Sequence, residues 1–442
     1  MSVPVILASQ SKARRDVLFH AGIRPTIRVS HVDEDAVVAH AAQQRGIPVD
    51  ELTCQERVPI LARAKAAAVY RDYMAITVTA ATATGEEVIS RPLEDGFGTV
   101  HRVVPLQEVF EQQQGMTDAQ VGPIIIGCDS MFELDGVAYG KPHTVEHARE
   151  RLRLMSGRTG TLWTGHCVID AATGRMVSRA SAAQVTFCNY TEEDIERYIA
   201  TGEPLEVAGS FTLDGFGGAF IDQIVGDPSG IIGLSLPLTR QLVEELDITW
   251  TDLWNIDRAE QQGAKKTSPA DPKAPQDNVN QPGDGFIDCT CGKQHWGLNG
   301  ASGVLLARRD PETGNVTDVL MQHRALWSAE GGTWGIPGGA TADGENTLEG
   351  ALRESQEEAN IHPEDIMVVG TYLEDHGPWG YTTVFAFEKP GHTVQARAND
   401  DESLEIAWVP IDKVGQLPLL KAMKTDWPSF EQRLQQLSHA IQ

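Results

Sequence analysis

Residues 124–130 read Ile-Ile-Ile-Gly-Cys-Asp-Ser, and this stretch decides the fold class of the first half of the chain. Three successive large apolar residues are expected of a strand that is buried on both faces of a sheet. Asp129 and Ser130 follow the strand, and α/β sheets bind their ligands at the carboxyl ends of such strands. The sequence therefore predicts a buried strand that ends in side chains suited to chemistry.

Strands and helices are predicted to alternate around this strand, which is typical of an α/β domain. Thr191 precedes a further helix, with Asp194 at the capping-box position. Residues 71–120 do not follow the alternation, and the Thr, Val and Ala residues of 76–84 predict some β character there. Apolar runs predict strands at 3–8, 162–169 and 183–187, and helical periodicity predicts helices at 12–21, 60–70 and 146–155.

The composition bounds the number of domains and excludes several classes of protein. The chain has 442 residues, roughly three times a typical domain of ~150 residues, which predicts two or more domains. It has 62 acidic and 36 basic residues and a net charge of −26, which argues against binding to polymeric nucleic acid or to an anionic membrane. Apolar residues make up 41% of the chain, too many for a disordered protein.

The cysteines and the apolar runs give information on the cellular compartment of the protein. The 6 cysteines are scattered along the chain, which predicts reduced thiols and not a disulfide framework. No apolar run approaches the ~18 residues that span a membrane, and the N-terminus lacks the basic and apolar segments of a signal peptide. We therefore expect a cytoplasmic protein without membrane contact.

The clearest domain boundary lies at residues 257–285. Prolines recur there among Lys, Asp, Gln and Asn, and the only sizeable apolar residue before Gly285 is Val279. Such a stretch buries too little surface to offset its ordering entropy, so we interpret it as a flexible linker; the alternative is a long ordered surface loop. This division gives an N-terminal domain at 1–256, with an insertion at 71–120, and a C-terminal domain at 286–442.

Hydroxyl and basic residues near the N-terminus suggest an anion site. Ser9 and Ser11 lie where the first strand passes into a helix, and hydroxyls and N–H groups at a helix N-terminus bind anions. Arg14 adds a fork-shaped cation one turn later. Taken alone, the pattern is more typical of a capped helix followed by solvated basic residues.

Nine ordered motifs between residues 3 and 250 resemble the Maf family of nucleoside triphosphate pyrophosphatases. The resemblance implies an ITPase-like α/β fold, a possible homodimer, and hydrolysis of a nucleoside triphosphate to a monophosphate and pyrophosphate with Mg²⁺ or Mn²⁺. The motifs are LASQSKARRDVL, HVDED, LARAKA, IIIGCDS, LDGVAYGKP, LMSGRTGTLWTG, YIATGEPLEVAGSF, DGFGGAF and GLSLPL.

The resemblance also implies roles for particular residues. Asp129 would hold a metal and take a proton from the attacking water, with Glu34 as a second metal carboxylate. The residues that would bind the triphosphate are Ser9, Ser11, Arg14, Lys65 and Lys141.

Three positions depart from the usual pattern of that family and bear on the base that is recognised: Ala13, Ser130 and Asp214. A carboxylate at Asp214 suits the N1–H and N2 donors of guanine. Residues 209–217 also look more like the branch that acts on 7-methyl-GTP. We favour such a substrate, with UTP, CTP and dTTP left open.

A Gly-Gly turn and an acidic segment follow the linker. On a helix, Glu354, Glu357 and Glu358 stand at i, i+3 and i+4 and share one face, where like charges repel. A divalent cation such as Mg²⁺ reverses that repulsion, because clustered oxygen ligands bind it. The alternative is a solvated acidic helix face.

The spacing resembles the Nudix box, and the resemblance implies an α/β/α sandwich with a mixed sheet. It implies hydrolysis of a nucleoside diphosphate linked to a further group, with Glu354 and Glu357 catalytic, the three helix glutamates binding metal, and Arg353 orienting a glutamate. The positions that match the box are Gly339, Glu345, Arg353, Glu354, Glu357 and Glu358.

Two positions of the box depart from the pattern. Ser355 replaces an apolar residue, which we expect to weaken packing modestly. Asn360 replaces the closing glycine, and we expect the turn to survive because Asn tolerates the left-handed conformation at a helix end. The sequence therefore predicts an active domain.

Cys289-Thr290-Cys291, together with His295, supplies three metal ligands, one short of a closed zinc tetrahedron. A β-hairpin at the domain edge is the interpretation we favour for this segment, with a metal site as the alternative.

Together the motifs predict a bifunctional nucleotide-cleaning hydrolase that acts on small-molecule nucleotides. Ser355 and Asn360 motivate an alternative, in which the Nudix domain senses a nucleotide without hydrolysing it and regulates the Maf domain. A cell-division regulator is suggested by family association only, and no sequence feature bears on it.

Overall fold

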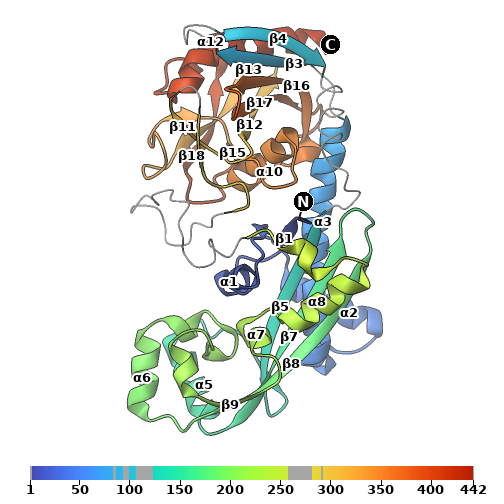
Figure 1. The fold of residues 1–442 in the computed structure, drawn as a ribbon, viewed down its shortest axis with the longest axis vertical. Coiled ribbons are helices and arrows are strands. Elements are labelled where there is room, and N and C mark those ends of the chain that lie inside the picture. Colours follow the sequence, from blue (N-terminus) through green and yellow to red (C-terminus); the bar gives the residue numbers. More distant parts are fainter. Residues whose placement is uncertain are drawn as a thin grey trace. The chain divides into compact units, whose positions relative to one another are not determined.

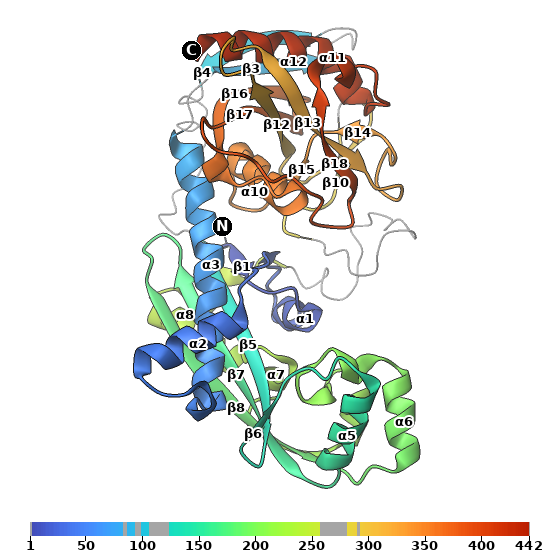
Figure 2. The ribbon, with the colours of Figure 1, turned by 180° about the vertical axis from the view of Figure 1, so that it is seen from behind.

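The computed structural model describes residues 2–82, 86–92, 99–105, 123–256, 281–289 and 292–441. The chain divides into two compact units, which are described one at a time. The first unit comprises residues 1–72 and 120–264, and the second comprises residues 73–119 and 265–442. Figures 1 and 2 show the elements of each unit from opposite sides.

The first unit is built on a mixed sheet with the strand order β2-β1-β5-β7-β8-β9, and β6 pairs with β5. β1 is parallel to both β2 and β5, and the other neighbours are antiparallel. The strands are β1 (Val5–Leu7), β2 (Thr26–Ile27), β5 (Ile124–Leu134), β6 (Val137–Tyr139), β7 (Thr159–Asp170), β8 (Met176–Phe187) and β9 (Ile221–Val225).

Helices cover this sheet, and α3 begins in the first unit and ends in the second. The α-helices are α1 (Lys12–His20), α2 (Glu34–Arg45), α3 (Cys54–Thr82), α5 (Val145–Met155), α6 (Glu192–Ala200), α7 (Pro228–Ile232) and α8 (Leu236–Glu245). Short 3₁₀ segments are η1 (Val49–Glu51), η2 (Glu203–Leu205), η3 (Ala208–Ser210), η4 (Phe216–Phe220) and η5 (Trp250–Leu253).

The predicted central strand is confirmed as β5, and both of its faces are buried. Ile124 and Ile126 pack in one cluster with residues of α1 and α8, and Ile125 is also fully buried. Helix α3 approaches β5 so closely that a Cβ on Gly127 would lie 2.4 Å from the carbonyl oxygen of Ala62. Glycine is therefore needed where the strand reaches its functional end.

Two local predictions have different outcomes. The capping box of α6 is confirmed, because Thr191 Oγ1 accepts from the Asp194 N–H at 3.1 Å and Asp194 accepts from the Thr191 N–H at 3.0 Å. The β character predicted for the segment 71–120 is confirmed at β3 (Glu86–Pro92) and β4 (Thr99–Pro105), but residues 76–82 belong to α3 and not to a strand. Ile76 packs in the core of the second unit, and such packing overrides the weak helix propensity of Thr and Val.

The second unit contains a mixed nine-stranded sheet and a separate two-stranded hairpin, β10-β11. The path of the large sheet is β14-β13-β12-β17-β16-β3-β4, with β15 on β12 and β18 on β13. Its strands are β3 (Glu86–Pro92), β4 (Thr99–Pro105), β12 (Ala301–Arg309), β13 (Val316–Arg324), β14 (Trp334–Gly335), β15 (Gly338–Ala340), β16 (Ile366–Asp375), β17 (Gly380–Glu388) and β18 (Ser403–Pro410). The hairpin strands are β10 (Phe286–Asp288) and β11 (Gln294–Trp296), and the helices are α10 (Thr347–Ala359), η6 (Pro363–Asp365), α11 (Ile411–Val414) and α12 (Lys421–Ala440).

Alternate residues of β12 face two different helices, as the two-residue period of a strand requires. Leu305 packs in a cluster with Trp427 and Phe430 of α12. Leu306 packs in a second cluster with Leu348 of α10. A sheet lies between two helical layers, which confirms the predicted α/β/α sandwich.

Strands β3 and β4, from the segment predicted to be an insertion, belong to the second sheet. β3 pairs in parallel with β16 and in antiparallel with β4. Pairing with β3 leaves β16 between two neighbours, so β16 is not an exposed edge.

The end of the predicted linker also belongs to the second unit. The N–H of Gly297 donates to Gly285 O at 2.7 Å, and the N–H of Leu298 donates to Gly283 O at 2.7 Å. Residues 257–280, the larger part of the predicted linker, lie outside the described residues.

Two whole-chain predictions can be compared with the described residues. None of the helices described there is both long and apolar enough to cross a membrane. Cys54, Cys128, Cys167 and Cys188 are free thiols, in agreement with the predicted reduced state.

Candidate active sites

In the first unit, one ammonium group joins two of the predicted carboxylates. Lys65 Nζ, from α3, lies 2.7 Å from Asp129 Oδ1 on β5 and 2.7 Å from Glu34 Oε1 at the start of α2. Asp129 is buried, whereas half of the Glu34 side chain is exposed. The structure therefore brings together the predicted base, the second carboxylate and one predicted cation.

Burial sets the electrostatics of Asp129. Desolvation raises the pKa of its carboxyl group, while Lys65 and then Arg14 act to lower it. The positive charge of Lys65 therefore stabilises the ionised form in a site that otherwise disfavours charge.

The Arg14 side chain is fixed by hydrogen bonds to several protein acceptors. Helix α1 begins after Ser11, whose Oγ accepts the N–H of Arg14 at 3.4 Å. An arginine has five N–H donors, and four of them are engaged here, so Arg14 ties α1 to β5 and to the end of α7. The four acceptors, at 3.0 to 3.3 Å, are Ser9 Oγ, Ser130 Oγ and the carbonyl oxygens of Cys128 and Gly233.

Three further predicted residues lie outside this network. Among the described residues, no hydrogen bond or ion pair joins Lys141, Ala13 or Asp214 to Asp129. Lys141 is exposed after β6, and Asp214 is exposed between η3 and η4. The proposed base-reading and triphosphate-binding roles of these residues depend on a bound nucleotide.

Thr164 is a member of this network that sequence reasoning missed. It lies opposite Ser130 in the β5–β7 register, with the two hydroxyl oxygens 3.1 Å apart. Its Oγ1 donates to Gly230 O at 2.8 Å in a fully buried position. The motif LMSGRTGTLWTG contains Thr164, but a threonine in a strand gives no signal of its own.

In the second unit, helix α10 carries the predicted glutamates. Asn346 caps its first turn, and Glu349 completes a capping box. The helix ends at Asn360, which has φ 57° and ψ 36°, as expected from the sequence. Both ends of the helix are therefore fixed by local hydrogen bonds.

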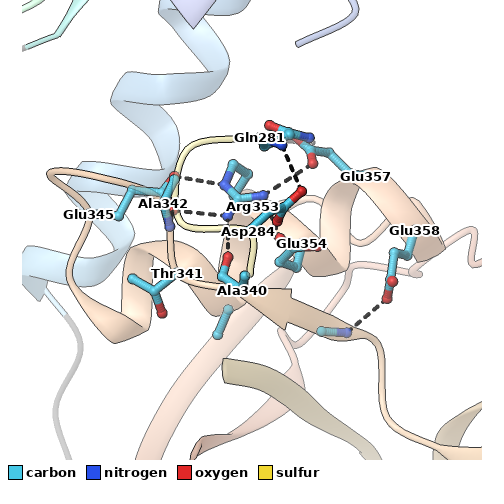
Figure 3. Close-up of polar contacts among 12 residues, drawn as sticks. Gln281, Asp284, Ala340, Thr341, Ala342, Glu345, Arg353, Glu354, Glu357 and Glu358 are labelled. Carbon is cyan, nitrogen blue, oxygen red and sulfur yellow. Dashed lines mark hydrogen bonds and ion pairs between the residues drawn. The ribbon is translucent and has the colours of Figure 1, made fainter. Parts of the chain in front are cut away.

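Arg353 is the centre of this site (Figure 3). Its side chain is only 2% exposed, and all five of its N–H donors have acceptors. Glu345 accepts two bonds, at 2.7 and 3.0 Å. Glu354 and Glu357 accept from Nη1 at 2.7 and 3.2 Å, and Ala340 O accepts from Nη2 at 2.9 Å. Arg353 thereby fixes three of the four predicted glutamates.

Glu358 has a different environment. Its Oε2 accepts the N–H of Gly338 at 2.8 Å and the Nε2–H of Gln322 at 3.2 Å. Burial and then the nearby carboxylates, that of Glu402 first, raise the pKa of Glu358 above its usual range. This glutamate therefore lies in a region with an excess of negative charge.

Sequence reasoning missed three further acidic residues in this region. Burial, and then Asp400 and Glu354, raise the pKa of Glu402 to about 7, and burial raises the pKa of Asp400 to about 6. Asp284 lies beside Arg353 and Glu354 in Figure 3 and accepts the Gln281 N–H at 2.6 Å. The acidic run Asp400-Asp401-Glu402 was the only sequence signal, and it is separated from the Nudix box.

The positions that depart from the Nudix pattern are accommodated. Ser355 is buried and its Oγ donates to Ala351 O at 2.7 Å, so its hydroxyl has a partner inside the helix. Asn360 Nδ2–H donates to Gln395 O at 2.9 Å. A Cβ on Gly339 would lie 2.6 Å from Glu354 Cδ, so a larger residue there would displace the Glu354 carboxylate.

Both sites offer oxygen ligands of the kind that bind hard divalent cations. The second site fits such a cation well, since its clustered carboxylates repel one another when no cation is bound. The first site fits through Asp129 and Glu34, which already converge on one positive charge.

Comparison with known proteins agrees with this geometry. A family model described as Maf-like protein matches residues 4–246, and one described as NUDIX domain matches residues 299–432. The chain is 60% identical over 481 aligned residues to a nucleoside triphosphate pyrophosphatase/Nudix hydrolase fusion protein of Bifidobacterium longum, with 100% of each chain covered.

Two further relatives each match one part of the chain. A nucleoside triphosphate pyrophosphatase of Nocardia farcinica is 41% identical over 257 residues, which are 58% of this chain and 98% of the relative. The solved structure of the Nudix hydrolase RenU from M. smegmatis is 36% identical and covers 36% of this chain and 98% of its own, with a TM-score of 0.31.

Two carboxylate sites on two α/β units, together with the two family models and the named pyrophosphatase relatives, define a hydrolase that acts on phosphoric anhydrides. The chain belongs to the Maf-like family and carries a NUDIX domain after its Maf-like part. Hydrolases of both families generally use divalent metal ions.

Proposed function

We propose that the first unit hydrolyses a nucleoside triphosphate to a monophosphate and pyrophosphate, and that the second hydrolyses a nucleoside diphosphate linked to a further group. The name of the full-length B. longum relative supports both activities. The observation that carries the first assignment is Lys65, which lies 2.7 Å from both Asp129 and Glu34.

In the first site, Asp129 is the proposed general base. It takes a proton from the water that attacks the phosphate chain, and the α–β anhydride bond breaks. Asp129 and Glu34 would hold the divalent cation, Mg²⁺ or Mn²⁺, which supplies charge neutralisation at the phosphates when bound. Lys65 and Lys141 offer ammonium groups to the phosphate oxygens.

Arg14 has two proposed contributions. Four of its donors bind protein acceptors, so it positions β5 and therefore Asp129. One N–H remains for a phosphate oxygen, alongside the hydroxyls of Ser9 and Ser11.

In the second site, Glu357 is the proposed base and Arg353 is a positioning residue. Of the two glutamates that share Arg353 Nη1, Glu357 is the more exposed, at 30% against 16% for Glu354. Glu354, Glu357 and Glu358 would hold the divalent cation, which supplies neutralisation of the diphosphate. Arg353 keeps the carboxylates of Glu354 and Glu357 in fixed directions.

For the first site we propose a 7-methyl-GTP-like substrate, with UTP, CTP and dTTP as competitors. Asp214 supports this choice, because its exposed carboxylate suits the donors of a guanine edge. Ala13 and Ser130 are the other proposed specificity positions.

Separate inactivation of the two sites in the full chain tests these assignments. Asp129→Asn is expected to lower pyrophosphate release from nucleoside triphosphates by about 100-fold or more and to leave the second activity intact. Glu357→Gln is expected to do the reverse. A panel of canonical and 7-methylated nucleotides identifies each substrate, and if neither variant loses any hydrolysis the proposal fails.

The alternative of a non-hydrolysing nucleotide sensor is not favoured. It was motivated by Ser355 and Asn360, and both residues have hydrogen-bond partners that preserve α10. Turnover by Asp129→Asn on nucleoside diphosphate derivatives would exclude it.

A further inference from the structure

Three metal-binding side chains that neither candidate active site uses meet in the second unit. Cys289 follows β10, His295 lies in β11, and His376 follows β16. One ligand atom from each residue lies within 4.8 Å of the other two. Ligands of a tetrahedral zinc ion are about 3.5 Å apart, given metal–ligand distances near 2.0–2.3 Å. A small contraction therefore brings all three onto one ion.

We infer that Cys289, His295 and His376 form a binding site for a borderline-soft divalent cation, zinc. A thiolate with two imidazoles prefers zinc to magnesium, whereas the carboxylates of the two hydrolytic sites prefer magnesium, calcium or manganese. The three side chains leave a fourth coordination position for water. Cys291 lies outside the described residues and is not part of the inference.

Backbone hydrogen bonds hold Cys289 in place next to the end of β10. The N–H of Cys289 donates to Lys293 O at 2.9 Å, and the N–H of Gly292 donates to Cys289 O at 3.0 Å. Gly292 has φ +79°, which glycine adopts without strain. Cys289 is buried, and its Sγ lies 3.7 Å from His376 O. The thiol thus points toward the segment that carries the third ligand.

The two imidazoles are oriented by neighbours of the kind found around metal sites. Glu374 Oε1 lies 2.8 Å from His376 Nε2, which favours a proton on Nε2 and a lone pair on Nδ1. A carboxylate behind a ligating histidine is common in zinc sites. The His295 ring stacks on Trp379 at 4.1 Å between centroids and 12° between planes, and it lies 4.7 Å from the ring of His376.

The hairpin itself gives a reason for such a site. β10 and β11 form a two-stranded sheet of their own, as the sequence predicted, and an isolated two-stranded hairpin is marginally stable in water. Phe286 and Trp296, the apolar residues of its ends, are each more than a third exposed. A cation shared with His376 would fasten the hairpin to the turn between β16 and β17.

The hairpin continues into a segment beside the second active site. Hydrogen bonds from the N–H groups of Gly297 and Leu298 hold Gly285 and Gly283. Asp284 lies between those two glycines and beside Glu354 in Figure 3. The zinc site would therefore be structural, and it would keep Asp284 in place.

Metal content and a cobalt spectrum of the full chain test the inference. The protein is loaded with zinc and dialysed against excess Mg²⁺ to clear the carboxylate sites. We expect wild type to retain zinc, and its Co²⁺ form to show a thiolate-to-cobalt charge-transfer band in the near ultraviolet. Cys289→Ser should abolish the band and the retained zinc. His295→Asn and His376→Asn should each weaken zinc binding by more than about 10-fold, the smallest loss typical of removing even an outer-shell partner of a ligand. Cys188→Ser, at a thiol of the first unit, is the matched control and should retain both.

A measurement on wild type alone guards against variants that do not fold. Zinc should slow alkylation of Cys289, followed by mass spectrometry, and should leave the rate at Cys188 unchanged. The inference is overturned if wild type retains no zinc and shows no cobalt band. It is equally overturned if Cys289→Ser keeps the band, or if zinc leaves the alkylation rate of Cys289 unchanged.

Discussion

The two candidate active sites offset the negative charge of their carboxylates in different ways. In the first, the Lys65 ammonium lies between Asp129 and Glu34, so cation and anions come from three separate elements. In the second, the Arg353 guanidinium holds Glu345, Glu354 and Glu357, while burial and further acidic residues raise the pKa of Glu358. Protein cations therefore offset most of the carboxylate charge in the first site, whereas carboxylates outnumber the guanidinium group in the second.

The largest effect should come from Arg353→Lys. A lysine has three donors and no fork, so it leaves some of the bonds to Glu345, Glu354 and Glu357 unmade in a buried position. Breaking a buried ion pair costs about 3–5 kcal/mol. Differential scanning calorimetry should show a loss of this size in the transition of the second unit and no change in that of the first.

Arg308→Lys is the matched control for Arg353→Lys. Arg308 also makes a two-bond pair, with Glu388 at 2.8 and 2.9 Å, but its side chain is 30% exposed. The loss there should stay within about 1 kcal/mol. Equal losses in the two variants would show that burial is not what makes Arg353 important.

The first unit should lose stability in mild acid because of a buried neutral histidine behind its site. His166 Nε2 accepts the Ser235 N–H at 2.7 Å, and burial and then Arg14 lower the pKa of His166 to about 4. The unfolded chain binds this proton near pH 6.5 and the folded chain near pH 4, so the stabilisation is complete above pH 6.5. It is lost as the pH falls to 4, by about 3 kcal/mol.

His166→Gln separates this effect from the titration of carboxylates. Unfolding of the first unit, followed from pH 7 to pH 4, should lose about 3 kcal/mol less in the variant than in wild type. The same slope in both proteins would contradict the assignment of the acid response to His166.

Magnesium should stabilise the second unit more than the first. At a Mg²⁺ concentration 100 times Kd, binding contributes about 2.7 kcal/mol, or a rise in Tm of roughly 5–10 °C. Most of this gain requires carboxylates in excess of the protein's own cations, and the first site has Lys65 between its two carboxylates. Calorimetry with and without a chelator measures the Tm of each unit. Glu357→Gln should reduce the Mg²⁺-induced rise in Tm of the second unit. Equal Tm shifts in both units would show that the two sites do not differ in their need for a cation.

Local sequence patterns predicted which site residues lie on the central strand of the first unit and on helix α10 of the second. The apolar run before Asp129 and the i, i+3, i+4 glutamates of α10 depend only on strand burial and helix period, and both are observed. Asn360 was expected to be left-handed because few other residues tolerate that conformation. Such features are fixed within a few residues of the chain.

Contacts between distant segments could not be predicted in this way. Asp284 and Glu402 reach the second site only when the sheet has formed, and neither belongs to a motif with a fixed spacing. The pairing of β3 with β16 joins residues 86–90 to residues 370–374, and no local pattern encodes that register. His376 joins Cys289 and His295 in the same manner.

The smallest effect concerns the departure from the Nudix pattern at Asn360, where the closing glycine is expected. Asn360→Ala forces a Cβ-bearing residue without a polar side chain into φ 57° and removes the bond to Gln395 O, at a cost of about 1–2 kcal/mol. Asn360→Gly relieves the backbone but loses the same bond, so it should change the stability of the second unit by less than about 0.5 kcal/mol. Calorimetry of both variants separates the two contributions. A similar loss of stability in both variants would show that Asn360 contributes its bond to Gln395 and not its tolerance of the left-handed backbone. The second site would then depend on the 395–399 segment as well as on α10.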